Sequence, residues 1–250
     1  MIQKFSMMLT PFNEVRRIFV YLPDDYETSG ERYPVTYMFD GQNLFEDSDA
    51  TYGTCWGLKD FLDNWNKEMI VVGIECAKTG PERAKEYLPF TVETGFYGLI
   101  QGECEKTYQW IIRELKPYID EHFRTWSHRE ATAIAGSSYG GAASCYGILF
   151  HNDVFSKAAL VSPSVNTLRR EALQKIHSGK LHPDTRIYFS IGSEEGGKDY
   201  GHIYENMCRE MEQAANKAGC MTYFYYQENG HHHERDWAKQ SDLWLNFLWK

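Results

Sequence analysis

The sequence of 250 residues lacks any apolar run long enough to cross a membrane. A transmembrane helix needs about 20 consecutive, mostly apolar residues. The N-terminal segment, residues 1–11, has one early lysine and too short an apolar run for a secretory signal peptide. We therefore expect no membrane partner for this protein.

Positive charge is also scarce in the sequence. Lysine and arginine together number 26 against 35 aspartates and glutamates, which gives a formal net charge of −9. The basic residues form no run on one face of a predicted helix, whereas a protein that follows a phosphate backbone needs a basic patch. The composition thus argues against a nucleic-acid partner.

Cysteine-based frameworks are missing as well. The six cysteines contain no CxxC pair and no dense spacing, which is typical of reduced thiols and predicts a cytoplasmic location. The sequence also has no internal repeat, low-complexity tract or linker. Because α/β domains often reach about 250 residues, we expect residues 1–250 to form one domain. Nothing in the sequence indicates the oligomeric state.

Aromatic residues, by contrast, are abundant, with 7 tryptophans, 17 tyrosines and 14 phenylalanines. Short apolar runs alternate with helical patterns along the chain. The predicted strands span residues 15–22, 34–39, 69–74, 132–135, 158–162, 186–191 and 221–226. Apolar strands alternating with helices predict a mainly parallel sheet that is covered by helices on both faces.

Two irregular stretches, residues 40–57 and 75–102, are longer than ordinary connections and rich in aromatic residues. In an open parallel sheet, the loops that leave the C-terminal ends of the strands surround the ligand site. We therefore predict substrate-binding roles for five aromatic side chains: Phe45, Trp56, Tyr87, Phe96 and Tyr97.

The sharpest motif is G-x-S-x-G, formed by Gly136, Ser138 and Gly140 between an apolar strand and a helix start rich in small residues. This context is typical of a nucleophile elbow, a tight turn that holds the serine in a strained backbone conformation. Glycine two residues before and after the serine removes a steric collision. The alternative is a structural Gly-Ser turn in front of a packed helix.

A serine hydroxyl needs a base, and the histidine run at 231–233 follows the last predicted strand and precedes the C-terminal helix. A loop at this position can bring an imidazole over the sheet edge toward Ser138. The run could instead hold a metal ion, but adjacent side chains diverge and metal-binding histidines prefer wider helical spacing. We expect catalysis that requires no metal and no organic cofactor.

The residue that orients the histidine is expected between Ser138 and the histidine run, in the chain order serine, acid, histidine. Three carboxylates follow the strand at 186–191, and Glu195 is the first choice, ahead of Glu194 and Asp199. A Ser–His dyad without an acid remains open.

Two backbone N–H groups are predicted to form the oxyanion hole. One belongs to Tyr139, directly after the serine, and the other to Gln42, in the loop after the second predicted strand. The segment Asp40-Gly41 in that loop could equally be only a turn.

Several blocks of the sequence resemble the "Putative esterase" (esterase D-like) branch of the α/β-hydrolases, in the family's order over nearly the whole chain. They include DGQNLF at 40–45, EYLPF at 86–90, ELKPYID at 114–120, GSSYGG at 136–141 and HHERDW at 232–237. This branch includes feruloyl and acetyl-xylan esterases and siderophore trilactone esterases. The resemblance implies an α/β-hydrolase fold with a mainly parallel central sheet, helices on both faces and no large separate cap domain.

The same resemblance implies Ser138 as the nucleophile and, through the family pattern H-x-E-x-x-W, His232 as the base. It also favours Glu195 as the acid. We therefore expect a carboxylic ester hydrolase that forms an acyl-enzyme with a small-molecule sugar, aryl-acyl or siderophore ester. The alternative is a catalytically silent protein of the same fold that binds a carbohydrate or a siderophore.

Overall fold

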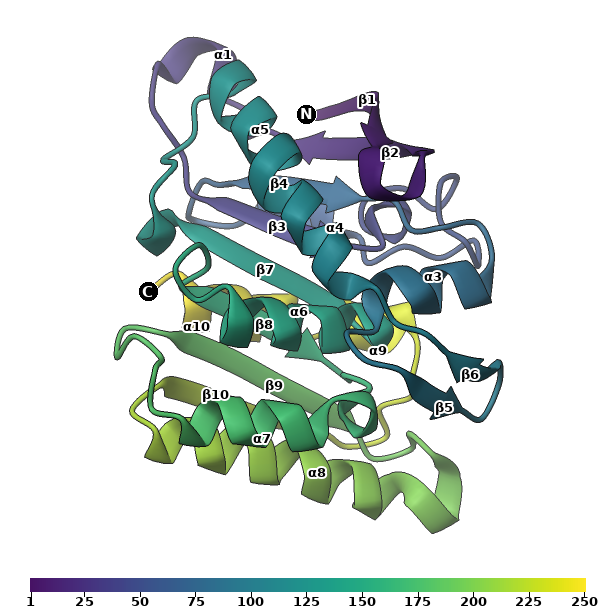
Figure 1. Ribbon diagram of the computed structural model, residues 1–250. Helices are drawn as coiled ribbons and strands as arrows, with labels where there is room; N and C mark the ends of the chain where they lie inside the picture. Colours follow the sequence, from purple (N-terminus) through teal and green to yellow (C-terminus); the bar gives the residue numbers. More distant parts are fainter.

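The computed structural model describes the backbone of all 250 residues and every side chain except those of residues 198–200. Asp199, one of the three candidate acids, therefore lies outside the described side chains. A central sheet of eight strands has the order β1-β2-β4-β3-β7-β8-β9-β10 (Figure 1). The strands are β1 (Ile2–Leu9), β2 (Glu14–Tyr21), β3 (Val35–Phe39), β4 (Ile70–Ile74), β7 (Thr132–Ser137), β8 (Lys157–Val161), β9 (Arg186–Gly192) and β10 (Met221–Gln227).

The sheet is parallel from β4 to β10, and β2 runs antiparallel to both of its neighbours, β1 and β4. This arrangement confirms the predicted fold class, and all seven predicted strands are present with ends within two residues of those expected. The sequence pattern does not predict β1, because this edge strand is mostly exposed or half-buried and has no continuous apolar run.

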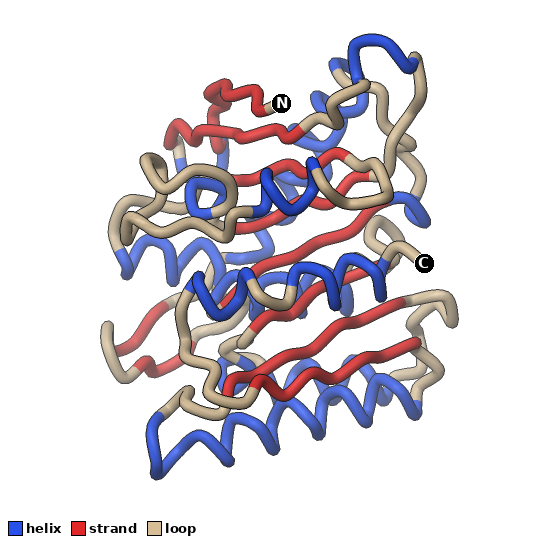
Figure 2. Tube along the Cα trace, turned by 180° about the vertical axis from the view of Figure 1, so that it is seen from behind, coloured by secondary structure: helices blue, strands red, loops and turns tan.

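Helices cover both faces of the sheet. One face carries α3 (Gly80–Tyr87), α4 (Cys104–Trp110), α5 (Lys116–His122), α6 (Tyr139–Phe150), α7 (Arg169–His177) and α8 (Gly197–Lys217). The other face carries α2 (Leu58–Asp63), α9 (Glu234–Ala238) and α10 (Ser241–Leu248), as seen from behind in Figure 2. The short helix α1 (Tyr26–Ser29) lies at the edge near β1. No helix among the described residues is long and apolar enough to span a membrane.

The central strands are apolar throughout because their alternate side chains pack into two separate cores. In β4, Ile70, Val72 and Ile74 belong to the core beneath α4 to α8, whereas Val71 belongs to the core beneath α2 and α10. Side chains of successive residues in a strand point to opposite faces. The apolar strands therefore follow from a sheet that is covered on both sides.

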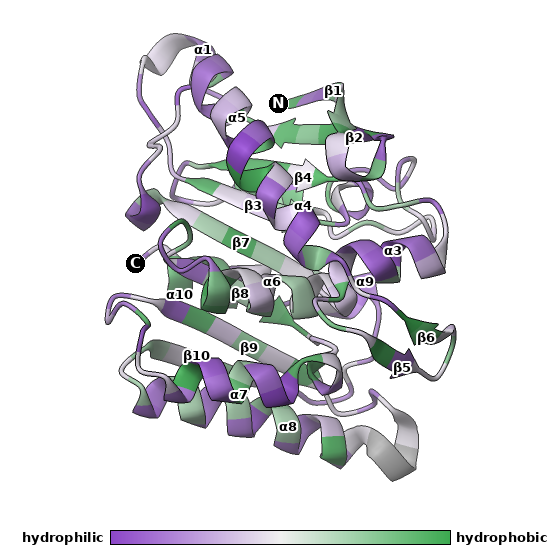
Figure 3. Ribbon diagram, viewed as in Figure 1, coloured by the Kyte–Doolittle hydropathy of each residue, from purple (hydrophilic) through white to green (hydrophobic). Residues whose placement is uncertain are grey.

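A two-stranded hairpin, β5 (Val92–Thr94) and β6 (Gly98–Ile100), lies outside the main sheet. Strand β6 and part of β5 are coloured as hydrophobic in Figure 3, although the hairpin lies at the periphery of the molecule. At its turn, Phe96 is 90% exposed, and Leu99 on β6 is 69% exposed. The long irregular stretch at 75–102 thus contains this hairpin and helix α3.

Candidate active site

The C-terminal ends of the parallel strands border a cleft of ≈ 680 Å³. Loops that follow β3, β4, β7 and β10 contribute its walls, as expected for an open parallel sheet. The lining includes Asp40, Gln42, Asn43, Arg83, Tyr97, Ser138, His232, Glu234 and Trp237.

Ser138 occupies the turn between β7 and α6 with φ 57° and ψ −122°, a conformation that a non-glycine residue rarely adopts. Such strain costs about 1–3 kcal/mol and persists only where neighbours enforce it. Here the Ser138 N–H donates to the Val161 carbonyl at 3.1 Å, and its own carbonyl accepts from Ser164 N–H at 3.0 Å. The serine is therefore held by the neighbouring strand β8 and by the loop that follows it.

The glycines of the motif are required by close backbone packing. A Cβ at Gly136 would lie 2.6 Å from the carbonyl carbon of Gly140, and a Cβ at Gly140 would lie 3.0 Å from the Cβ of Phe39. Real Cβ contacts are almost never as short as the one at Gly136, and the one at Gly140 is tighter than nine in ten of them, so a larger residue at either position would push the turn apart. This is the steric reason that the sequence motif anticipates.

Gln42 lines the cleft and Tyr139 directly follows Ser138, and the backbone N–H groups of both have no hydrogen-bond partner among the described residues. The Gln42 side chain fixes its loop, since its Nε2 donates to Thr51 Oγ1 and Cys76 Sγ, both at 3.1 Å, and its Oε1 accepts from Cys76 N–H at 3.2 Å. Burial raises the pKa of Cys76 to about 12, so the thiol stays neutral. The loop therefore holds a free N–H donor in a fixed position.

A partly buried ion pair supports the start of the same loop. Arg83 Nε and Nη2 donate to the two carboxylate oxygens of Asp40 at 2.7 and 2.8 Å. Burial alone would lower the pKa of Arg83, but the Asp40 carboxylate outweighs it and raises the pKa above its ordinary value. The Asp40 N–H donates to the Tyr87 hydroxyl at 3.2 Å. Sequence reasoning assigned no functional role to Arg83 or Asp40, although both lie within or beside the family-like blocks.

His232 contacts one of the candidate acids directly. Its Nδ1 lies 2.7 Å from Oε2 of Glu195, whose side chain is 5% exposed. The other oxygen, Oε1, accepts hydrogen bonds from Gly192 N–H at 2.8 Å and from Ser162 Oγ at 2.5 Å. Glu194, by contrast, is exposed and contacts Ser193 Oγ at 3.2 Å.

No direct hydrogen bond joins the side chains of Ser138 and His232, both of which are described and line the cleft. Catalytic hydrogen bonds are often long or misaligned before substrate binds. The structure thus brings the predicted serine, histidine and Glu195 to one site, with the histidine–carboxylate contact already made.

Trp237 completes a closed ring of contacts behind the histidine, which joins His232, Glu195, Ser162 and Trp237. Its Nε1 donates to Ser162 Oγ at 2.9 Å, and its ring meets the His232 ring edge-on at 87° with centroids 5.0 Å apart. Because Ser162 accepts from Trp237, its own hydroxyl proton is directed at Glu195. Sequence reasoning assigned no role to Ser162 or Trp237, although Trp237 is the last residue of the H-x-E-x-x-W pattern.

The three adjacent histidines have three different partners. His231 donates its backbone N–H to Asp236 at 2.8 Å, while His233 Nδ1 accepts from Arg235 N–H at 3.1 Å and caps α9. The hydrogen bond from Lys239, helped by the His231 N–H, lowers the pKa of Asp236 to about 2. Among the described residues, no group of three or more histidine, cysteine or carboxylate side chains could hold a metal ion.

The five predicted substrate-binding aromatics are dispersed. Phe45, Trp56 and Tyr87 are 7, 4 and 1% exposed and belong to the two cores, and Phe96 projects from the turn of the β5–β6 hairpin. Tyr97 lines the cleft, and its hydroxyl packs directly against Gly80. The structure thus brings Tyr97 to the cleft but not the other four.

Comparison with known proteins gives a consistent result. A sequence model of the family described as "Putative esterase" matches residues 10–242. The chain is 29% identical over 206 residues to the uncharacterized protein YbbA of Bacillus subtilis. This match covers 79% of this chain and 76% of that protein. It is also 29% identical over 186 residues to esterase Rv1288 of Mycobacterium tuberculosis, covering 73% of this chain but 35% of that protein. The chain therefore spans about a third of the mycobacterial esterase.

Among solved structures, an IroE-like serine hydrolase from Shewanella oneidensis superimposes with a TM-score of 0.79. The match covers 99% of this chain and 79% of that chain at 17% sequence identity. At this identity the likeness concerns the fold, which is that of the α/β-hydrolases.

Proposed function

The chain belongs to the "Putative esterase" family and is a carboxylic ester hydrolase, and we propose that it works through a Ser138–His232–Glu195 triad. The observation that carries this proposal is the 2.7 Å contact between His232 Nδ1 and the buried Glu195 carboxylate, in the cleft that Ser138 also lines. A carboxylate at this position fixes the imidazole tautomer that leaves Nε2 free to accept a proton.

In the proposed reaction, Ser138 Oγ attacks the ester carbonyl carbon while His232 Nε2 takes the hydroxyl proton. The negative charge that develops on the carbonyl oxygen is held by the N–H groups of Tyr139 and Gln42. His232 returns the proton to the leaving alcohol as the carbon–oxygen bond breaks, which leaves an acyl-enzyme. A water molecule, deprotonated by the same histidine, then releases the acid and restores Ser138.

The lining of the cleft favours a hydroxyl-rich ester, such as a sugar ester, over an aryl-acyl or siderophore ester. Polar side chains contributed by Asn43, Thr51, Lys78 and Glu234 line it, and of the five predicted aromatics only Tyr97 contributes a ring. Hydroxyl groups of a sugar can form further hydrogen bonds to these side chains, whereas an apolar aryl group would displace water from them without offering any hydrogen bond. We infer that acetylated sugars are better substrates than feruloyl sugars.

A nucleophile test separates this proposal from other chemistry in the same cleft. Ser138→Ala should abolish both p-nitrophenyl acetate hydrolysis and labelling by a fluorophosphonate probe. Ser137→Ala, one residue earlier in the chain and also at the cleft, is the matched control and should keep the label. Labelling that persists in Ser138→Ala would overturn the assignment of the nucleophile.

We further propose that residues 1–250 form one α/β-hydrolase domain, because strands from both ends of the chain, β1 and β10, join the same sheet. A single cooperative unfolding transition, monitored by two spectroscopic probes, would support this organisation, and two separate transitions would contradict it. The six cysteines are free, which supports a cytoplasmic location. Fractionation of the source cells tests that location.

A further inference from the structure

A second cavity, of ≈ 500 Å³, lies at the opposite end of the sheet from the catalytic cleft. Its lining includes residues directly before or at the N-terminal ends of parallel strands, namely Pro34 before β3, Met69 before β4, Ala131 before β7 and Lys157 at the start of β8. Strand β7 runs from this cavity to the elbow, a length of about 20 Å for six residues. In Figure 1 the C-terminus marks the same end of the sheet.

Three of the seven tryptophans line this cavity: Trp65, Trp126 and Trp249. Trp126 is 46% exposed, although large aromatic rings usually bury most of their surface. Planar ligands stack on such rings, and a volume of this size lies within the range of small-molecule sites. The cavity therefore offers flat apolar faces to a ligand ring.

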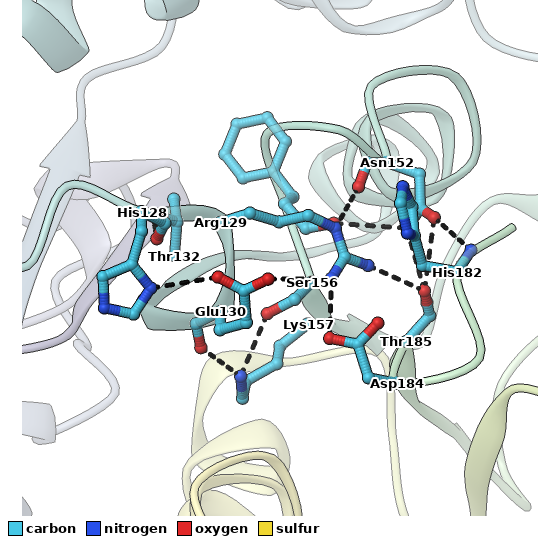
Figure 4. A network of polar contacts seen from close by, with 11 residues as sticks. His128, Arg129, Glu130, Thr132, Asn152, Ser156, Lys157, His182, Asp184 and Thr185 are labelled. Carbon is cyan, nitrogen blue, oxygen red and sulfur yellow. Dashed lines mark hydrogen bonds and ion pairs between the residues drawn. The ribbon is translucent and has the colours of Figure 1, made fainter.

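The same cavity carries ammonium groups that have no carboxylate partner. Lys157 Nζ donates to the Glu130 carbonyl and to Ser156 Oγ at 3.0 Å (Figure 4). It also lies 4.8 Å from the centre of the Trp249 ring. Lys67 Nζ donates to the Trp249 carbonyl at 2.7 Å. Among the described residues, neither lysine lies within ion-pair distance of a carboxylate. Lys67 Nζ lies 5.7 Å from the centre of the Trp65 ring, so each ammonium group places positive charge beside an indole ring of the cavity.

The surroundings of Lys157 leave its ammonium group without a compensating carboxylate. Its neighbour Arg129 is already paired with Asp184 at 2.7 Å, so that carboxylate is not available to the lysine (Figure 4). Burial, with Arg186 and Arg129 adding to it, lowers the pKa of Lys157 to about 8. A bound anion would oppose this lowering, because an opposite charge stabilises the ammonium form.

The charge of the lining also differs from that of the whole chain. Four cationic and three acidic side chains line the cavity, so its lining is close to neutral, whereas the whole chain carries −9.

We propose that this cavity is a second binding site, separate from the catalytic cleft, for a small aromatic carboxylate. The carboxylate group pairs with the ammonium groups of Lys157 and Lys67, and the ring stacks on the indole faces of Trp126 and Trp249. Charge-assisted hydrogen bonds to an ammonium group are among the strong ones, and the rings add aromatic selectivity.

The test is calorimetric titration of the full chain with benzoate. Two probes separate the contributions: cyclohexanecarboxylate keeps the charge without the ring, and benzyl alcohol keeps the ring without the charge. We expect saturable benzoate binding, and at least several-fold weaker binding of both other probes.

Variants place the binding site. Lys157→Gln should weaken benzoate binding by at least about tenfold, which is the loss of affinity expected when one hydrogen bond to a charged group is removed. Trp126→Ala, at an exposed ring, should weaken it several-fold and is the second variant if Lys157→Gln does not fold. Lys78→Gln, at a lysine of the catalytic cleft, is the matched control and should bind benzoate as the original protein does.

Ester hydrolysis provides an independent readout, because Lys157→Gln should leave kcat/KM for p-nitrophenyl acetate unchanged. The proposal is overturned if benzoate does not bind, or if cyclohexanecarboxylate binds equally well. It is also overturned if Lys78→Gln abolishes benzoate binding while Lys157→Gln does not, since benzoate would then occupy the catalytic cleft.

Discussion

Replacing Glu195 by glutamine should disable catalysis by forcing the wrong histidine tautomer. Oε1 of Glu195 accepts from Gly192 N–H and from the Ser162 hydroxyl, so the glutamine carbonyl oxygen will take that position. Two hydrogen bonds at about 1 kcal/mol each favour this orientation by about 2 kcal/mol. The amide NH2 then faces His232 Nδ1, which must act as the acceptor.

The consequence for the reaction follows from the imidazole ring. If Nδ1 of His232 accepts a hydrogen bond, the proton resides on Nε2, and the ring cannot take the Ser138 proton. In a triad, this kind of substitution lowers kcat by about 10⁴-fold. We therefore expect kcat/KM for p-nitrophenyl acetate to fall by about 10³–10⁴-fold in Glu195→Gln, with KM nearly unchanged because the defect lies in the chemical step.

The matched control is Glu194→Gln, which changes the same charge on the adjacent exposed side chain. Its kcat/KM should stay within about twofold of the original protein, as is usual for an exposed site away from the chemistry. Steady-state kinetics and the rate of fluorophosphonate labelling check both variants, and thermal unfolding checks that each is folded. A loss below tenfold in Glu195→Gln, or equal losses in both variants, would refute the reasoning and indicate a dyad.

Three further predictions follow from other contacts. Arg83→Met leaves the Asp40 carboxylate buried without its partner and should lower the free energy of unfolding by about 3–5 kcal/mol, measured by urea denaturation. Asp236→Asn should also be less stable than the original protein at neutral pH. Because the folded pKa of Asp236 is lowered to about 2, this difference should be full above the ordinary aspartate pKa of about 3.9 and disappear as the pH falls through 2, and a constant difference would contradict it. Tyr97→Ala should raise KM for a sugar ester several-fold, whereas Phe96→Ala, at a neighbouring ring that does not line the cleft, should not; equal effects would argue against a role for Tyr97.

The sequence was most informative where structure is local. The elbow at 136–140 is predictable because the glycine spacing, the preceding strand and the following helix lie within about ten residues. The central strands are predictable because burial on both faces requires continuous apolar runs. In both cases the residues that determine the local structure lie within one short segment of the sequence.

The sequence was less informative where a role depends on partners far along the chain. The neighbours Glu194 and Glu195 differ in burial only because Ser162, Gly192 and His232 converge on one of them. No local pattern distinguishes these two carboxylates. Long-range contacts therefore explain why the acid could be ranked but not assigned from the residues alone.

The orientation of the aromatic side chains was also not predictable from the sequence. Phe45 and Trp56 occupy the loop expected to border the cleft, but they pack into the core beneath α2 and α10. A loop can pass a ligand site and still direct its apolar side chains inward. Composition therefore indicates that rings are present without showing which way they point.

The contact between Gly41 and Gly73 has a consequence for enzyme engineering. A Cβ at Gly41 would collide with the backbone at Gly73, and a Cβ at Gly73 would lie 2.9 Å from the Cα of Gly41. The loop that carries the Gln42 N–H therefore rests on β4 main chain against main chain, so substitutions at either glycine would misplace it. Libraries that seek new substrates should hold these glycines constant and diversify the rim of the cleft, at Tyr52, Lys78 and Tyr97, where side chains border open space.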